Sequence, residues 1–275
     1  MSFNLQKKLD SGSEYTAGKN RSPLESSDSG AVAVGESVLQ RDSIIYLDED
    51  FAVVVKETGE VCEEGVPHSL SNRLRPLVEE RLGHRVFRCE CVHRLDQPVS
   101  GLCLLGLTEQ GIRLLSQCFA SRSVKKSYCA ITERRSASLV QESPPAGEEQ
   151  WVQLDCLMTF DGGLQKARIV KAEAGGKNNA SLRYKVLGQG ERYDFLLLEP
   201  LTGRSHQIRC QLAAIGRPIK GDLKYGAKRS EKIGGIRLHA WKLEFSHPMT
   251  GEKLSFTCLP PKMDTLWQVC TAFLH

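Results

Sequence analysis

Short apolar runs, some continuous and some interrupted by polar positions, recur along the chain after residue 42. Runs of this length are typical of strands that are buried on one or both faces. The first pair of runs, at 43–56, flanks the acidic residues Asp48 to Asp50, which predicts a hairpin. Further strands are predicted at 86–91, 102–107, 128–132, 151–160, 166–173, 180–187, 194–200 and 236–245.

Other segments have the three-to-four-residue apolar spacing of an amphipathic helix. The first of them, at 69–83, contains Pro76, which is expected to bend or divide the helix. Thr108 is expected to cap the second, and Ser205 to cap the third, which should stop at Gly216. The helices are predicted at 69–83, 108–119 and 206–215.

These elements predict a mixed α+β fold: a single domain at 42–275, built on a largely antiparallel sheet with flanking helices. The 275 residues are 40% hydrophobic and 25% charged, which is ordinary for a soluble globular protein. Residues 1–41 contain eight Ser, four Gly and no sustained periodicity. Such a segment buries too little apolar surface to offset the entropy of ordering it, so we predict a flexible tail.

Composition also restricts location and metal content. The sequence has no run of 18 apolar residues and no apolar segment at its start, so we expect a cytoplasmic protein without a membrane span. Its ten cysteines include no CxxC pair and are expected to stay reduced. Cys89, Cys91 and His93 would share one face of a strand, but a closed zinc site needs a fourth ligand, so we predict no metal.

An apolar, strand-like segment runs into the stretch His93 to Asp96, which holds the main candidate for chemistry in the sequence. Pro98 and the Ser100-Gly101 pair break the chain before the next apolar run, which places Asp96 in a loop at the end of a strand. Such a position suits a reactive carboxylate that the scaffold presents. The alternative is an Asp that only hydrogen-bonds its own backbone in a turn.

Positive charge is concentrated in one region. The net charge of the chain is only +4, but residues 201–242 contain ten Lys or Arg against two acids, Asp222 and Glu231. A local excess of this kind suits a polyanionic partner such as RNA. A solvated basic face is the alternative.

Several stretches of the sequence match known motifs. The stretch His93-Arg-Leu-Asp-Gln-Pro-Val-Ser-Gly101 resembles the HRLD motif of the RluA class of RNA pseudouridine synthases, which is followed two residues later by TSG; Val99 stands in place of the Thr. Tyr128 lies in a segment similar to the Lys-x-Tyr element of the class. The segments 203–209 and 221–226 resemble its GRTHQIR helix and GDxxYG turn.

The resemblance extends from about Ile44 to about Leu259. One departure is Lys56-Glu-Thr-Gly59, where the class has Lys-Pro-x-Gly. Lys56 could face RNA, although an exposed lysine at the end of a strand is the simpler interpretation.

The resemblance implies the pseudouridine synthase fold and an isomerase that acts on specific uridines of rRNA or tRNA. No group is lost and no oxidation state changes in this reaction, so we expect no cofactor, and we expect a monomer. Asp96 would be the catalytic carboxylate, Arg209 its basic partner and Tyr128 the ring that stacks on the flipped uracil, with Ile208 as a second apolar wall. Arg94 would fill the space that the base leaves. Phosphate contacts are expected from Lys125, Lys126, Arg204, Arg217, Lys220, Lys224, Lys228 and Arg229.

Two other functions remain open at this point. A glycosidase or nucleoside hydrolase would use Asp96 with a second carboxylate, for which Asp222 is the only nearby motif acid. A non-catalytic RNA-binding protein on the same scaffold would be expected to have lost at least one of Asp96, Tyr128 and Arg209, and the sequence has all three.

Overall fold

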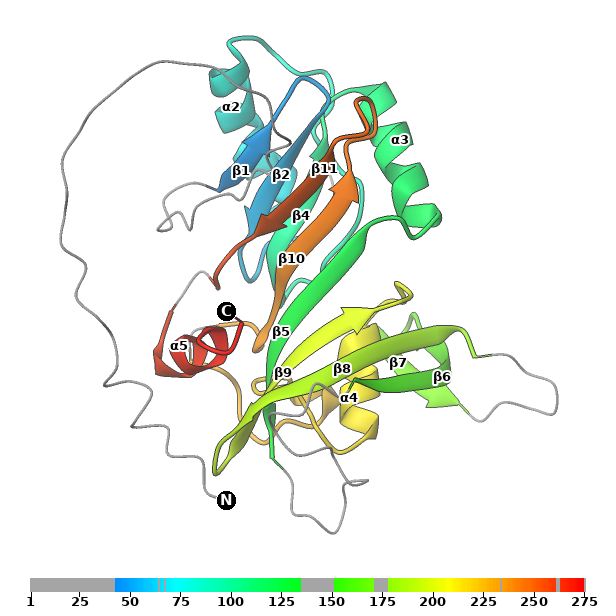
Figure 1. Ribbon diagram of the computed structural model, residues 1–275, viewed down its shortest axis with the longest axis vertical. Coiled ribbons are helices and arrows are strands. Elements are labelled where there is room, and N and C mark those ends of the chain that lie inside the picture. The colour runs from blue at the N-terminus through cyan, green and yellow to red at the C-terminus, as the bar shows by residue number, and fades with distance from the viewer. Residues whose placement is uncertain are drawn as a thin grey trace, which may run out of the picture.

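The computed structural model describes residues 43–63, 65–66, 68–134, 151–170, 178–232, 234–260 and 263–274. The predicted tail at 1–41 and most of the loop expected at 134–150 lie outside these described residues. Within them the chain forms a mixed α+β fold, as predicted, and a single sheet runs through its whole length (Figure 1).

The sheet has eleven strands, hydrogen-bonded in the order β1-β2-β4-β10-β5-β9-β8-β6-β7, with β3 beside β4 and β11 beside β10. Every pairing between these strands is antiparallel except that of β4 with β10. The strands are β1 (Ile44–Leu47), β2 (Phe51–Lys56), β3 (Glu90–Cys91), β4 (Ser100–Gly106), β5 (Lys125–Glu133), β6 (Val152–Asp161), β7 (Lys166–Val170), β8 (Ala180–Gln189), β9 (Tyr193–Pro200), β10 (Leu238–Ser246) and β11 (Lys253–Thr257).

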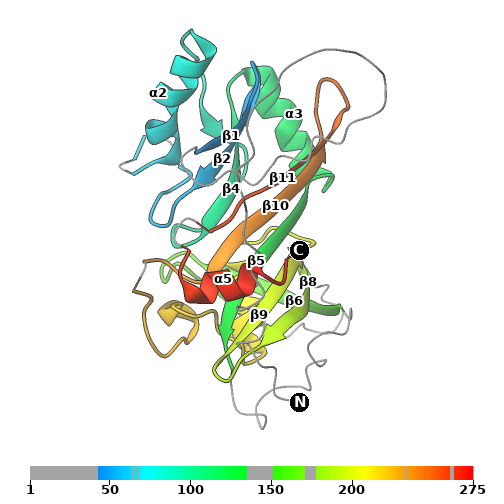
Figure 2. The ribbon, with the colours of Figure 1, turned by 60° about the vertical axis from the view of Figure 1, so that its left-hand side comes forward.

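Helices cover both faces of the sheet at each end. Helices α2 (Leu70–Leu82) and α4 (Gln207–Ala214) pack on one face, where they share a core with Val54 and Leu196. Helices α3 (Glu109–Ala120) and α5 (Thr265–Thr271) pack on the other face, against Val53 and Phe195 respectively. Neighbouring residues of a strand point to opposite faces, so β2 and β9 are buried on both sides. Figure 2 shows α2 and α3 flanking the same end of the sheet.

Several local predictions are confirmed. β1 and β2 form the predicted hairpin, and Gly111 N donates to Thr108 Oγ1 at 3.0 Å, so Thr108 caps α3. Pro76, in contrast, lies inside α2 without dividing it, because Leu74 and Val78 fix the helix in the core on both sides of the proline. The pattern also missed β11 and α5, and it started β5 three residues too late.

Candidate active site

Asp96 lies in a connection between β3 and β4, residues 92–99, here called the Asp96 loop. Main-chain carbonyls along this loop are bound by neighbouring segments. Val99 N donates to Asp96 O at 2.9 Å, Gly59 N to Gln97 O at 2.8 Å and Ile236 N to Pro98 O at 3.1 Å. Leu95 N donates to the thiol of Cys62 at 3.4 Å. A loop with this many fixed backbone groups presents its carboxylate in one place.

Lys56 is part of this support, and its exposed position at a strand end was predicted wrongly. Its side chain is fully buried, and its ammonium donates to Val99 O at 2.7 Å, Gln97 O at 3.2 Å and Glu57 O at 3.0 Å. Burial lowers the pKa of Lys56. The strand end is covered by the Asp96 loop, so the lysine points into the protein instead of toward RNA.

Gly101 explains why the motif ends in glycine. Its φ is 124°, and a Cβ at this position would lie 2.4 Å from Ala240 O and 2.5 Å from Ala240 N. The close approach occurs where β4 pairs with β10 in parallel. Only glycine fits both the backbone angle and the space. The hydroxyl of Ser100, next to it, is 2.8 Å from Nδ1 of the buried His239.

The His93 side chain supports the Asp96 loop as a neutral ring. Leu104 N donates to His93 Nε2 at 3.1 Å, so the ring carries its proton on Nδ1. Burial lowers the pKa of His93 to about 4, which keeps the ring uncharged at neutral pH. It stacks on Phe119 with ring centroids 4.6 Å apart. His93 therefore braces the structure through Leu104 N and Phe119.

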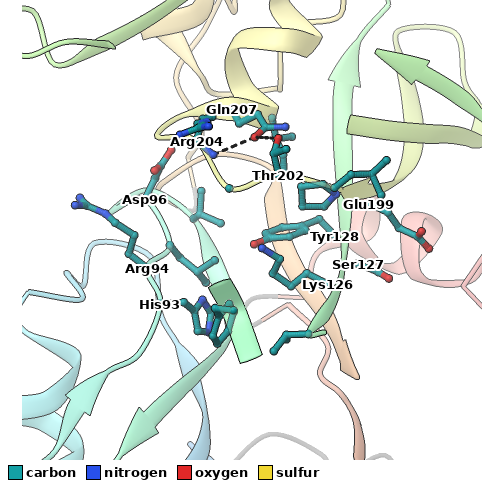
Figure 3. A pocket seen from close by; sticks show the side chains of 18 of the residues that line it. His93, Arg94, Asp96, Lys126, Ser127, Tyr128, Glu199, Thr202, Arg204 and Gln207 are labelled. Atoms are coloured by element: carbon teal, nitrogen blue, oxygen red, sulfur yellow. Dashed lines mark hydrogen bonds between the residues drawn. The ribbon is translucent and has the colours of Figure 1, made fainter. Parts of the chain in front are cut away.

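Helix α4 forms the opposite side of the site, and the turn before it is held by Gln207. Its Oε1 accepts from Arg204 N at 3.0 Å and from Thr202 Oγ1 at 2.8 Å (Figure 3). Ser205 was wrongly predicted to cap this helix. The N-cap residue is His206, in a left-handed conformation and without a side-chain capping bond, and the helix starts at Gln207.

Arg209 joins the two sides through a buried guanidinium. Nη1 donates to Asp96 Oδ2 at 3.0 Å, while Nε and Nη2 donate to Asp222 Oδ2 and Oδ1 at 2.7 and 2.9 Å. Burial works against the charge, but the hydrogen bonds and charges of Asp222 and Asp96 outweigh it and raise the pKa of Arg209. The guanidinium also lies over the ring of Tyr225, 5.0 Å from its centroid.

These groups open onto a pocket of about 970 Å³. Asp96, Tyr128, Ile208 and Arg209, the residues predicted to act together, all line it. In Figure 3 Asp96 and Arg94 lie on one side of the pocket and Tyr128 and Lys126 on the other. Burial raises the pKa of Tyr128, so at neutral pH it is an uncharged phenol that can stack or hydrogen-bond but is not an anionic base.

The basic residues predicted to contact RNA separate into two groups. Lys125, Lys126, Arg94 and Arg204 line the pocket. Lys126 is mostly buried, which lowers its pKa, and its ammonium lies 5.7 Å from the centroid of the Phe119 ring. Among the described residues, no acidic side chain forms an ion pair with it.

The other basic residues do not line the pocket. Arg217 is buried and ion-paired with Asp194, and Lys220 is ion-paired with Glu231, so neither is presented to an external phosphate. They hold the fold together instead. Lys224 is exposed and donates to Gln165 O at 3.0 Å, while Lys228 and Arg229 are exposed beyond the pocket lining.

Sequence reasoning missed three contributors to the site, namely the bracing role of Lys56, the bidentate role of Asp222 and the contact of His206 with the site. The sequence placed Asp222 in the turn at 221–226 and offered it as the second carboxylate of a hydrolase, but not as a partner of Arg209. That turn contains a short 3₁₀ helix, η2 (Leu223–Tyr225). The sequence signal that could have revealed this role of Asp222 was an acidic residue inside a motif that is otherwise made of turn residues.

No group of three His, Cys, Asp or Glu among the described residues is arranged to hold a metal ion. The ten cysteines are free thiols. None of the described helices is both long and apolar enough to cross a lipid bilayer.

Comparisons with known proteins show which family the chain resembles. Residues 50–214 match the family described as RNA pseudouridylate synthase. The dual-specificity RNA pseudouridine synthase RluA of Pasteurella multocida is 31% identical over 79% of this chain and 92% of its own length. The tRNA pseudouridine synthase C of Pectobacterium carotovorum is 30% identical over 84% of this chain, which spans 61% of that relative.

Solved structures are similar at the level of the fold. Human RNA Pseudouridylate Synthase Domain Containing 4 superposes with a TM-score of 0.61 at 21% identity, covering 84% of this chain and 92% of that one. Human RNA Pseudouridylate Synthase Domain Containing 1 gives 0.60 at 24% identity, covering 90% and 98%.

Proposed function

Because this chain belongs to the RNA pseudouridylate synthase family and is an RNA pseudouridine synthase, we propose that Asp96 is the carboxylate that isomerises its target uridine. The target is a uridine of rRNA or tRNA that is flipped out of its stack into the pocket. One relative is named for tRNA and the other for dual specificity toward RNA, so we propose both RNA classes as candidate substrates.

The reaction breaks the bond between N1 of uracil and C1′ of ribose and forms a bond between C5 and C1′. The proton on C5 leaves and N1 gains one, so the product is an isomer of the substrate. Asp96 can contribute by attacking C1′, as the carboxylate of a retaining glycosidase does, or by accepting a ribose proton. Both roles need an ionised carboxylate that reaches the sugar.

The observation that carries the proposal is the 3.0 Å contact between Arg209 Nη1 and Asp96 Oδ2 at the pocket. A carboxylate in a pocket that has lost its water tends to take up a proton, and an adjacent cation opposes this. At about 4 Å and an effective dielectric constant of about 20 the attraction is roughly 4 kcal/mol, before desolvation is counted against it. The Asp96 side chain is 18% exposed, so it is largely shielded from water but can still be reached by a nucleotide in the pocket.

The other pocket residues have roles in holding the base. We assign the Tyr128 ring to stacking on uracil and Ile208 to the opposite apolar wall. Arg94 has a side chain that is 69% exposed, which lets it reach an RNA duplex. There it would occupy the space left by the flipped base, whose unstacking costs a few kcal/mol. Lys125, Lys126 and Arg204 would contact phosphates beside the pocket.

A hydrolase that pairs Asp96 with Asp222 is not favoured. Both oxygens of Asp222 accept hydrogen bonds from Arg209, and its side chain is 1% exposed. A second catalytic carboxylate must reach a water molecule or the sugar. Asp222 therefore holds the arginine and is not free for acid–base chemistry.

We further propose that the protein acts as a monomer in the cytoplasm. Ten free thiols suit a reducing compartment. Sedimentation of the purified protein together with cell fractionation would check both points.

The test replaces Asp96 by Asn and measures tritium release from RNA labelled with ³H at C5 of uridine. Asp222 still holds Arg209 in the variant, so we expect Asp96→Asn to fold and bind RNA with no detectable isomerisation. Glu199→Gln is the matched control, because Glu199 lines the pocket but its carboxylate points away from Asp96 in Figure 3. Isomerisation by Asp96→Asn would disprove the proposal, and release of free uracil by the native protein would support the hydrolase.

A further inference from the structure

His206 has a backbone conformation that helix capping does not explain. Its φ is 55° and its ψ is 21°, in the left-handed region that few non-glycine residues occupy. As N-cap residue of α4 it makes no side-chain capping bond. Its imidazole is 16% exposed and lines the same pocket as Asp96. A residue held in such a conformation beside a reactive group is a candidate for function.

The hydrogen bonds of Tyr225 determine which nitrogen of His206 carries the proton. The Tyr225 hydroxyl accepts from Ala167 N at 2.8 Å, and it lies 2.9 Å from His206 Nδ1. Among the described residues Nδ1 is the only acceptor within reach of the hydroxyl proton, so that proton has a partner only when it points at Nδ1. Nδ1 is then the acceptor, so a neutral His206 carries its proton on Nε2. That nitrogen is 3.9 Å from Asp96 Oδ2.

The surroundings of His206 favour the neutral ring. Burial, Arg209 and Lys224 lower its pKa, and the nearby carboxylates Asp96 and Asp222 oppose this without reversing it. On the other side, the edge of the ring faces Phe160, with centroids 5.5 Å apart and planes at 85°. The ring is therefore clamped between β6, η2 and the Asp96 loop.

We propose that His206 is a positioning residue for Asp96, whose Nε2–H closes onto Asp96 Oδ2 when a nucleotide fills the pocket. The inference rests on the proposed function of Asp96. Hydrogen bonds at active sites are often long without substrate and tighten in the complex. Oδ2 would then be held by both Arg209 and His206, which leaves Oδ1 to face the ribose. Tyr225 contributes by fixing the tautomer of His206. The hydrogen bond from Ala167 N to the Tyr225 hydroxyl in turn holds that hydroxyl against strand β7.

The tautomer can be tested without any measurement of activity. In ¹⁵N-labelled protein, long-range ¹H–¹⁵N spectra of the histidine rings should show His206 with unprotonated Nδ1 and protonated Nε2. The ring should titrate below the usual histidine pKa of about 6.5. In Tyr225→Phe the bond that stabilises the neutral form is lost, so the pKa of His206 should rise and both tautomers should appear. Protonated Nδ1 in the native protein would overturn the proposal.

The activity measurement compares two substitutions of His206. Both place a side chain on the same left-handed backbone, so they strain it alike. His206→Phe keeps an aromatic ring but has no donor, whereas the amide nitrogen of His206→Gln can take the place of Nε2. We expect His206→Phe to lower kcat about 10- to 100-fold with unchanged RNA affinity, the effect of one hydrogen bond to a charged group. His206→Gln should recover most of that loss.

Two results separate failure of this inference from failure of the proposed function. If His206→Phe and His206→Gln both keep native kcat, or lose it equally at equal melting temperature, His206 does not position Asp96. If instead Asp96→Asn is fully active, Asp96 is not the catalytic carboxylate. The ¹H–¹⁵N spectra still test the predicted tautomer of His206 in that case, because they do not depend on activity. Should His206→Phe not fold, Tyr225→Phe decides: unchanged kcat with an altered tautomer would refute the inference.

Discussion

The two sides of the pocket are held by different kinds of bond. The Asp96 loop is held through its main chain, with Lys56, Gly59 and Ile236 bound to its carbonyls. The α4 side is held through side chains, above all the Arg209–Asp222 pair. Backbone bonds depend little on which side chain the loop carries, whereas an ion pair fails when either partner is replaced. The loop therefore tolerates a change such as Val99 for Thr, and the α4 side depends on each charge.

The largest effect is expected from breaking the ion pair on the α4 side. Asp222→Ala leaves Arg209 with a single carboxylate partner in a buried position, a change that typically costs about 3–5 kcal/mol of folding free energy. We expect isomerisation to fall more than about 100-fold, since misplacing a catalytic group by 1 Å can cost that much. Thermal unfolding and tritium release measure the two effects.

Asp194→Ala is the matched control for that experiment. It breaks the buried pair of Asp194 with Arg217, which lies outside the pocket lining. A similar loss of stability with near-native kcat in the folded fraction is expected. If Asp194→Ala lowered kcat as much as Asp222→Ala does, the α4 side would have no special dependence on its ion pair.

The next effect comes from the loop side. Lys56→Met removes the donor from two carbonyls of the Asp96 loop and from Glu57 O. Leaving buried groups without partners costs about 1–3 kcal/mol each, but the loss of a buried charge offsets part of it, so we expect the variant to fold with a lower melting temperature. The loop should shift, with kcat reduced about 10-fold and RNA affinity unchanged. An unchanged kcat would show that the remaining backbone bonds suffice.

The smallest effect concerns the rim of the pocket. Lys125 is exposed, and its replacement by Ala should reduce the slope of log affinity against log salt by about one while leaving kcat unchanged. Lys232→Ala is the control, because that lysine is also exposed but does not line the pocket. Equal slopes of log affinity against log salt for the two variants would show that Lys125 does not contact the RNA.

The sequence was more informative about which residues line the pocket than about the residues that support them. Asp96, Tyr128 and Arg209 belong to long motifs, and their meeting at one pocket follows from the fold that those motifs imply. Lys56 looked exposed because a strand end gives no sign of what covers it. The strand expected at 86–91 was reduced to the two residues of β3, since only Glu90 and Cys91 find partners on β4. Helix α5 was missed because its seven residues are too few for a clear period.

The place of β10 in the sheet has a consequence for how the enzyme is made. This strand pairs with β4 on one side and β5 on the other, directly behind the Asp96 loop, yet it comes from residues 238–246 of a chain of 275. Contacts between segments so distant in sequence form late in folding. During synthesis the Asp96 side of the pocket must wait, with a sheet edge uncovered, until the ribosome has delivered residues 238–246. Truncated chains should therefore be inactive even when they contain every motif residue.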